Sequence, residues 1–361
     1  MPERTAIMSV YHIHPLRWEN DPEEERFKVT ALDYLSVQTY NNYALFFRLA
    51  DEDKHDAAEV LKAGLERTLS QARHLCGIIE KDTAGGHSFC KKRDSTVQFV
   101  KANFVRGGLF FIMHHHHYSN DVMGWAGLTY QLAENCYATK SEPPEAAKAD
   151  GPPAPERPPE QRTGISLLFH LPKSKAPELK ALATPEDGTW VSTYDAFSAF
   201  IFPHLTQLRA HIFKPAFPWP LWKLAAYIRA LTNSVTQENL DVMVDMVAIV
   251  RDKSTLNIRI DAQPPMSILQ TDHRDANITV ADFGFGAPVT YRHLLDRVTN
   301  GVVIIYPPRV TAKDSDEGRE FAIFYKKDLA QTLVDDPEWN DYFEYRGEDA
   351  IDATATRSRQ T

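Results

Sequence analysis

The sequence predicts an α/β protein whose mixed sheets and helices are divided between two halves of the chain. Short apolar runs of strand length alternate with longer stretches whose apolar residues recur at helical spacing. This order is found on both sides of a proline-rich connection at residues 140–162. The chain has 361 residues, of which 43% are hydrophobic and 25% charged, so it can form one large domain or two medium domains with buried cores.

The first half is predicted to hold several strands, one long helix before a histidine-rich stretch and one helix after it. The strands are expected from apolar and aromatic runs at residues 6–18, 43–49, 77–80 and 97–111. Residues 55–73 predict an amphipathic helix, because Leu61, Leu65 and Leu69 form one apolar stripe. Residues 125–137 predict the second helix from apolar residues at the same spacing.

Residues 140–162 differ in character from the rest of the chain. They contain seven prolines among small and acidic residues. Proline fixes the backbone angle φ and removes a donor that a sheet or helix needs, which favours an extended connection. We therefore predict an N-terminal domain at residues 1–139, a linker at 140–162 and a C-terminal domain at 163–346.

The second half repeats the mixture of strands and helices. Strands are expected at residues 165–171, 268–269, 278–280, 302–306 and 321–325. Helices are expected at residues 177–184, 193–209, 221–231, 237–250 and 329–333, and Pro203 should kink the second of them. The polar residues 347–361 are expected to be a disordered tail.

Composition excludes several classes of protein. The net charge of −9 argues against a general nucleic-acid binder, whose affinity depends on a basic face. The three cysteines Cys76, Cys90 and Cys136 fit a reducing compartment better than a disulfide scaffold. The N-terminus lacks the features of a signal peptide, and no apolar run reaches the length of a membrane span. We expect a cytoplasmic protein with no nucleic-acid or membrane partner.

The stretch from Leu109 to Asp121 carries the densest set of ionisable side chains. Leu109 to Met113 predicts a buried strand, and four consecutive histidines, His114 to His117, follow at its exit. If the chain turns helical near His117, then His117 and Asp121 lie on one helix face. Alternatively, Asp121 turns away and anchors the loop, and His117 is left to face a cleft.

Four interpretations of the histidines compete. A purification tag does not fit a mid-chain position in an apolar context. A metal site needs convergent ligands, but consecutive strand residues alternate faces, so we expect no metal. The histidines could simply pack as partly buried polar residues. The fourth interpretation is a catalytic base, because the unperturbed pKa of histidine lies near the pH of the cytosol.

Two motifs resemble one protein family. His117-x-x-x-Asp121, followed by Asp282-Phe-Gly284-Phe-Gly286, is similar to the motif pair of the BAHD acyl-CoA-dependent acyltransferases. The second motif also begins like the magnesium loop of protein kinases, but no kinase glycine loop or catalytic loop accompanies it. Further similarity lies at residues 101–108, 191–200 and 301–309, and the flanking residues look closest to the fungal trichothecene 3-O-acetyltransferase-like branch.

The resemblance implies a fold, an activity and roles for the motif residues. BAHD enzymes have two chloramphenicol-acetyltransferase-like domains, with the site in the channel between them. The matching role of His117 is the general base that deprotonates a hydroxyl as it attacks acyl-CoA, commonly acetyl-CoA. Asp121 orients the histidine loop and Asp282 holds the second loop. Gly284 and Gly286 permit backbone angles that a side chain would forbid.

The resemblance also implies the ligands. The acceptor is expected to be a small secondary-metabolite alcohol, and the protein a monomer. Aromatic residues expected near the site permit a bulky apolar alcohol such as a terpenoid or polyketide: Trp125, Trp219, Trp222 and Phe285. The phosphates of CoA need cations, for which we expect Lys223, Lys253, Arg259 and Arg292. At least two of these four should lie together beside the channel mouth.

The chain departs from the family in ways that leave a second hypothesis open. Val122 replaces the glycine that commonly follows the motif aspartate, and Phe285 replaces a tryptophan. The chain is also shorter than family members, with apparent gaps at residues 93–101 and 211–219. The first hypothesis is an active acyl-CoA-dependent O-acyltransferase. The alternative is a shortened, catalytically weak or inactive member that acts in binding only.

Overall fold

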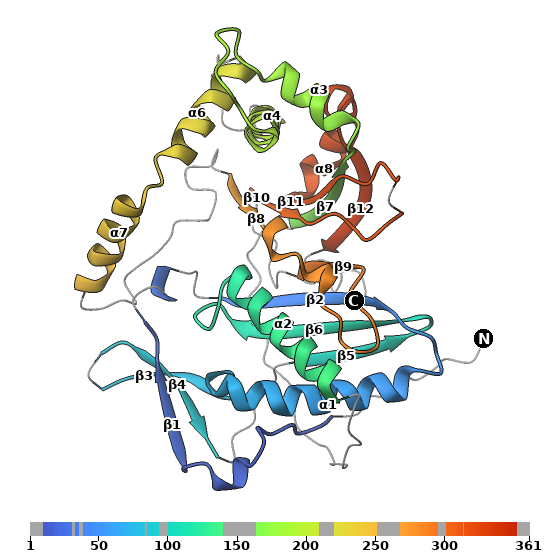
Figure 1. The fold of residues 1–361 in the computed structure, drawn as a ribbon. Coiled ribbons are helices and arrows are strands. Elements are labelled where there is room, and N and C mark those ends of the chain that lie inside the picture. The colour runs from blue at the N-terminus through green and yellow to red at the C-terminus, as the bar shows by residue number, and fades with distance from the viewer. Residues whose placement is uncertain are drawn as a thin grey trace, which may run out of the picture. The chain divides into compact units, whose positions relative to one another are not determined.

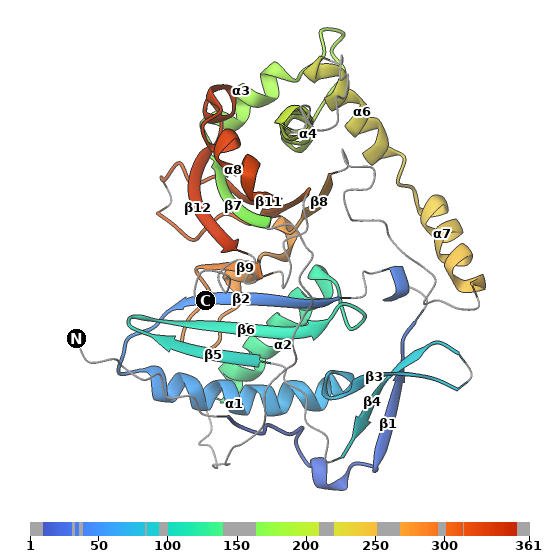
Figure 2. The same cartoon turned by 180° about the vertical axis from the view of Figure 1, so that it is seen from behind.

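The structure is a computed structural model, shown in Figures 1 and 2. It describes residues 10–30, 33–35, 39–83, 85–93, 100–139, 164–208, 220–250, 268–294, 301–312 and 314–351. The described residues form two compact units. Unit 1 draws on the ranges 1–30, 39–160 and 278–291, and unit 2 on 31–38, 161–277 and 292–361. The predicted linker at 140–162 lies outside the described residues.

Unit 1 is built on a four-stranded sheet with the order β5-β6-β2-β9. Its strands are β2 (Tyr40–Arg48), β5 (Val100–Val105), β6 (Gly108–His116) and β9 (Thr290–Leu294), of which only Thr290 and Tyr291 belong to unit 1. The helix α2 (Val122–Thr139) crosses one face of this sheet and packs against α1 (Lys54–Gln71), as Figure 1 shows. The two helices and the strands β2, β5 and β6 lie where the sequence predicts them.

A smaller sheet of unit 1 has the order β1-β4-β3. It consists of β1 (Glu24–Lys28), β3 (Ile78–Lys81) and β4 (His87–Lys92). The strand expected at residues 6–18 is not found among its described residues 10–18. The strand β1 lies instead in the following charged stretch, because its acidic residues pair across the sheet with lysines of β4, as Glu25 does with Lys91.

Unit 2 is built on a five-stranded sheet with the order β12-β7-β11-β10-β8. Its strands are β7 (Gly164–Leu171), β8 (Leu269–Asp272), β10 (Val302–Tyr306), β11 (Arg319–Lys326) and β12 (Glu344–Ile351). Every residue of β7 is buried, as expected of an inner strand that is covered on both faces.

Most described helices of unit 2 begin and end close to the predicted positions: α3 (Lys175–Leu182), α4 (Thr193–Leu208), α6 (Leu221–Asn233), α7 (Gln237–Ile249) and α8 (Lys327–Val334). The short helix α9 (Pro337–Asn340) was not predicted. The core lies between the sheet and α4, where Phe197 contacts Phe321 and Phe343. The helix α4 remains one element through Pro203. No described helix is both long and apolar enough to cross a membrane.

Two predicted elements of the second half are wrong. Residues 278–280 form a 3-10 turn instead of a strand, since Ala281 donates its backbone N–H to Ile278. Residues 347–351 are not a tail but continue β12, which pairs with the fully buried β7 through register shifts at Gly347 and Ala350. These irregularities hide the alternation on which a strand prediction depends.

The segment 278–291, which carries the second motif, belongs to unit 1 and not to the body of residues 163–346 with which the sequence analysis grouped it. Phe283 is fully buried, and its ring lies 5.1 Å from that of Phe47 on β2. The backbone N–H of Val289 donates to the carbonyl of Phe46 at 2.8 Å. Apolar contact and main-chain pairing therefore hold both motifs in one unit.

Candidate active site

His114, His115 and His116 are the last three residues of β6, and His117 is the residue that follows the strand. Because side chains alternate across a strand, His115 is buried on one face and His114 and His116 are half-buried on the other. The strand pairs with β2, where His115 faces Asn41 and His116 faces Tyr40. The four histidines therefore do not converge. Among the described residues, no group of three or more His, Cys, Asp or Glu side chains could hold a metal ion.

His115 is a core residue. Its ring stacks at 5.5 Å on that of Tyr43, which stacks in turn at 4.1 Å on the fully buried Trp125. Burial, with a smaller contribution from the neighbouring histidines, lowers the pKa of His115 to about 3. His115 therefore stays neutral. For this histidine, the interpretation that it simply packs in the protein interior holds.

On the opposite face of β6 from His115, the side chains of His114 and His116 pack around the ring of Tyr40. The Tyr40 ring stacks on His114 at 4.7 Å and meets the edge of His116 at 5.0 Å. A small pocket of about 210 Å³ lies beside them, and its wall includes Ile78 and Phe89 from the smaller sheet. Burial, together with His117 and His87, lowers the pKa of His116 to about 4. The sequence analysis missed Tyr40, although its position opposite His116 follows once the two strands are paired.

His117 is the first residue after β6. Its backbone N–H donates to the carbonyl of Thr39 at 2.8 Å, which fixes the chain where it leaves the sheet. The side chain is half-buried, and its Nδ1 atom is buried without a regular hydrogen bond to any described residue. Burial lowers the pKa of His117, and the backbone of His117 itself and Asp121 oppose that shift. The imidazole is therefore neutral at neutral pH and able to accept a proton.

Asp121 caps the helix that leaves the histidine loop. Its Oδ1 accepts the backbone N–H of Gly124 at 2.8 Å, and α2 begins at the next residue, Val122. This is the geometry of an N-cap, which satisfies a donor that the first turn leaves free. The loop from 117 to 121 is not helical, so the structure supports the alternative in which Asp121 anchors the loop. Gly124 is required there, because a Cβ atom would lie 2.7 Å from that of Asn120.

The second motif forms a tight turn. The exposed Asp282 accepts the backbone N–H of Gly284 through Oδ1 at 2.8 Å, and Phe283 donates its backbone N–H to Gly286 at 3.1 Å. Gly284 and Gly286 have φ angles of 83° and 126°, which residues with a side chain rarely adopt. Both glycines therefore adopt backbone angles that a side chain would disfavour.

The aromatic and basic residues expected around the site differ in their burial and in their partners. Trp125 is fully buried, whereas Trp222 is 42% exposed and Phe285 is half-buried. Lys223 is exposed on α6, and the buried guanidinium of Arg292 pairs with the carboxylate of Glu320. Three further residues lie outside the described part of the chain: Trp219, Lys253 and Arg259. The expected cluster of CoA-binding cations stays a prediction.

Comparison with known proteins identifies the family. No protein-family model matches the chain. The acetyltransferase FGR3 of Gibberella zeae is 52% identical over 469 aligned positions, which cover 94% of this chain and 94% of the relative. Because 469 positions exceed the 361 residues of this chain, the relative contains segments that have no counterpart here.

Solved structures share the fold. F. graminearum TRI101, solved with coenzyme A and deoxynivalenol, has a TM-score of 0.70 at 16% identity, covering 90% of this chain and 100% of that one. F. sporotrichioides TRI101, solved with coenzyme A and T-2, has a TM-score of 0.68 at 16% identity, covering 89% and 99%. Vinorine synthase has a TM-score of 0.65 at 15% identity, covering 93% and 97%. The predicted α/β fold class is confirmed by the fold that the chain shares with TRI101 and vinorine synthase, and the chain belongs to the family of the acetyltransferase FGR3.

Proposed function

We propose that the protein transfers an acyl group, with acetyl as the first to be tested, from acyl-CoA to a hydroxyl of a small acceptor, and that His117 is the general base. The observation that carries this proposal is the neutral, half-buried imidazole of His117 at the exit of β6, in a chain 52% identical to an acetyltransferase. Because Nδ1 is buried, Nε2 is the nitrogen left to meet a substrate.

The proposed reaction uses these groups as follows. The acceptor hydroxyl gives its proton to Nε2 of His117 while its oxygen attacks the thioester carbonyl. The carbon–sulfur bond then breaks, and the leaving CoA thiolate takes the proton from the imidazolium. Proton transfer to a positioned base of this kind is typically worth about 10²–10⁴ in rate. Asp121, four residues after His117, is proposed as a positioning residue, because it caps the start of α2.

The ligands of this chain are inferred from its family and from the proteins that share its fold. TRI101 structures contain coenzyme A together with T-2 mycotoxin or deoxynivalenol. For this chain we propose acyl-CoA as the donor and an apolar, hydroxylated secondary metabolite as the acceptor. CoA-binding roles for Lys223, Lys253 and Arg259 stay part of this proposal, as does a cytoplasmic monomer. Asp282, Gly284 and Gly286 are proposed to shape the second loop.

The direct test is a transfer assay on the full chain. Acetyl-CoA is supplied with a panel of hydroxylated terpenoids and polyketides, and both the freed CoA thiol and the acetylated product are measured. We expect at least one acceptor to give product in an amount equal to the freed thiol. Thiol release that is independent of every acceptor would contradict acyl transfer to a hydroxyl.

A second candidate function rests on the length of the chain. The relative contains segments that are absent here, which favours a member that binds acyl-CoA or an acceptor without transferring the group. Calorimetry separates the two candidates. Binding of CoA together with no turnover across the whole panel would favour the binding-only function.

A further inference from the structure

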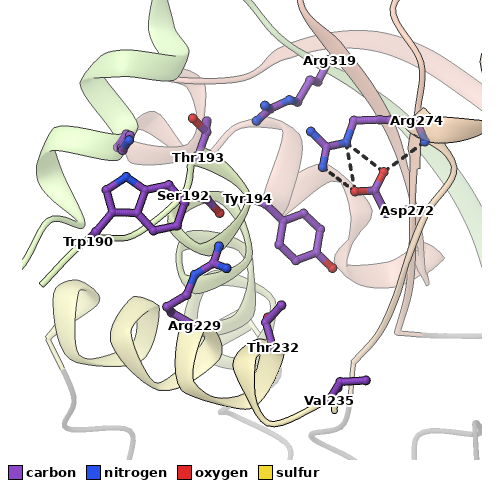
Figure 3. A pocket seen from close by; sticks show the side chains of 11 residues that line it. Trp190, Ser192, Thr193, Tyr194, Arg229, Thr232, Val235, Asp272, Arg274 and Arg319 are labelled. Carbon is purple, nitrogen blue, oxygen red and sulfur yellow. Dashed lines mark hydrogen bonds and ion pairs between the residues drawn. The ribbon is translucent and has the colours of Figure 1, made fainter. Parts of the chain in front are cut away.

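His116 lies directly before the proposed base and takes no part in the proposed reaction. It is half-buried on the face of β6 opposite to His115, beside the pocket of about 210 Å³. A larger cavity, of about 670 Å³, belongs to unit 2, and its wall includes Arg229, Arg274 and Arg319 (Figure 3). None of the four histidines lines that larger cavity. The hydrogen bonds of His116 lie instead in the turn that follows β6.

Three successive backbone donors of this turn have defined acceptors. His117 donates its N–H to the carbonyl of Thr39 at 2.8 Å. Tyr118 donates its N–H to Nδ1 of the His116 imidazole at 3.1 Å. Ser119 donates its N–H, at 2.9 Å, and its hydroxyl, at 2.7 Å, to the carbonyl of His116. His117 is therefore the second residue of a turn that His116 closes with both its carbonyl and its side chain.

The bond from Tyr118 determines where the His116 imidazole carries its proton. Nδ1 can accept a hydrogen bond only while it has no proton, so the neutral ring carries its proton on Nε2. Burial, with smaller contributions from His117 and His87, lowers the pKa of His116 to about 4. The ring is therefore neutral at neutral pH, and Nδ1 remains an acceptor for the Tyr118 amide.

Aromatic side chains pack against the His116 ring from two sides. The ring centres of Tyr40 and Tyr118 lie 5.0 and 4.6 Å from it, and both pairs are edge to face. Tyr40 also stacks on His114 at 4.7 Å, and His114 donates from Nδ1 to Oδ1 of Asn42 at 2.5 Å. A ring packed in this way keeps one rotamer, so its acceptor atom is fixed relative to the turn.

We propose that His116 is a positioning residue for the base, because its Nδ1 holds the Tyr118 amide and with it the turn that sets the direction of the His117 imidazole. This inference rests on the proposed role of His117. Loss of the bond frees the main chain directly after His117, and a small loss of orientation at a catalytic group costs a large share of the rate. The four histidines then divide their roles: His115 packs in the core, His114 and His116 support the turn, and His117 accepts the proton.

The test compares two replacements of the same ring in the full chain. His116→Phe keeps an aromatic ring but has no acceptor for the Tyr118 amide. His116→Asn offers a carbonyl oxygen that can accept the N–H two residues further along the chain, as asparagine does in Asx turns. His55→Phe, at an exposed histidine on α1, is the matched control. A thermal melt of each protein checks its folding, and His116→Ala replaces His116→Phe if that variant does not fold.

Two measurements do not depend on turnover. NMR on tyrosine-labelled protein follows hydrogen exchange at the Tyr118 amide, and fragment mass spectrometry follows the modification of His117 by diethyl pyrocarbonate. We expect exchange at Tyr118 to be about fivefold faster or more in His116→Phe, the effect of one lost hydrogen bond. Modification of His117 should also be faster, because its ring is no longer held. His116→Asn and His55→Phe should both resemble the wild type.

Turnover with acetyl-CoA is the third measurement. We expect His116→Phe to lower kcat about tenfold or more while KM for acetyl-CoA stays within about twofold, and His116→Asn to recover most of the lost kcat. Absence of turnover in the wild type would contradict the proposed function, and amide exchange and His117 modification would then decide the positioning role alone. That role is overturned if exchange at Tyr118 is unchanged in folded His116→Phe, if faster exchange leaves both His117 modification and kcat unchanged, or if His116→Asn restores none of the lost properties.

Discussion

His117 combines two properties that a base needs at neutral pH. It is neutral because burial lowers its pKa, and it is only half-buried, so a substrate can reach it. His115, two residues earlier, has the first property without the second, since it is 4% exposed and packed against Tyr43. The alternation of the strand and its end at His116 separate a core histidine from the histidine proposed as the base.

Replacement of His117 by alanine is expected to lower kcat/KM for acetyl transfer by about 10²–10⁴, because the proposed base is removed. The free energy of unfolding should change little, since the ring lies at the edge of the core. The measurement is acceptor acetylation together with a urea melt. His55→Ala, at an exposed histidine on α1, is the matched control and should behave like the wild type. Near-full activity of His117→Ala would contradict the role of His117 as the general base.

Asp121 offers a test that separates capping from charge. Asp121→Ala should lower the free energy of unfolding by about 1 kcal/mol, because the N-cap bond to Gly124 is lost. Asp121→Asn keeps an oxygen in the same place and should be nearly as stable as the wild type. Asparagine removes the carboxylate that raises the pKa of His117, so the acidic limb of the kcat/KM profile should move to lower pH. An unshifted profile in Asp121→Asn would show that the charge does not act on His117.

His115 predicts how stability depends on pH. Its pKa is about 3 in the folded chain and near 6.5 when exposed, so below pH 6.5 the unfolded chain binds a proton that the folded chain does not. Its contribution to stability is complete above pH 6.5 and falls by about 1.4 kcal/mol per pH unit as pH decreases toward 3. His115→Phe should therefore reduce the loss of stability between pH 7 and pH 5 by about 2 kcal/mol. Urea melts at both pH values measure this, and an unchanged loss would contradict the buried, neutral state of His115.

At the scale of elements, periodicity predicted the long helices and inner strands well. The stripes of α1 and α2 and the apolar run of β7 are each set by one local pattern, which is visible without tertiary information. Elements whose pairing decides their conformation were missed. The charged strand β1 depends on cross-strand pairs with β4, and β12 depends on β7. Neither partner is adjacent in sequence.

The same limit applies to the site residues. His117 and Asp121 lie only four positions apart in the sequence, so one short motif marks both as candidates. The environment of Arg292 could not be foreseen, because its partner Glu320 lies on β11 and is itself completely buried. Arg229, Arg274 and Arg319 come from three separate elements, and no spacing along the chain marks them as one cavity.

Arg292 was expected to bind CoA, and its pairing with Glu320 supplies a competing structural role. If the role is structural, Arg292→Met should lower the free energy of unfolding by about 3 kcal/mol, because a buried carboxylate loses a partner, while CoA affinity stays within about twofold. Arg309→Met is the control, since Arg309 contacts the same carboxylate but is 39% exposed, and its loss should cost much less. A large loss of CoA affinity with intact stability would restore the binding role.

For the whole molecule, the open question is whether the shortened chain keeps both ligand binding and turnover. The fold is shared with TRI101 over most of both chains, yet the 52% identical relative carries segments that this chain lacks. A ligand that binds only the folded state stabilises it by mass action, by about 2.7 kcal/mol at a concentration one hundred times its Kd. We therefore expect CoA to raise the melting temperature of the wild type and of His117→Ala alike, because removal of the base leaves the CoA site in place. Only the wild type should then turn over acetyl-CoA in the presence of an acceptor. Stabilisation of both proteins without turnover by either would identify a binding-only member, and the absence of stabilisation in both would show that the missing segments are needed to hold the donor.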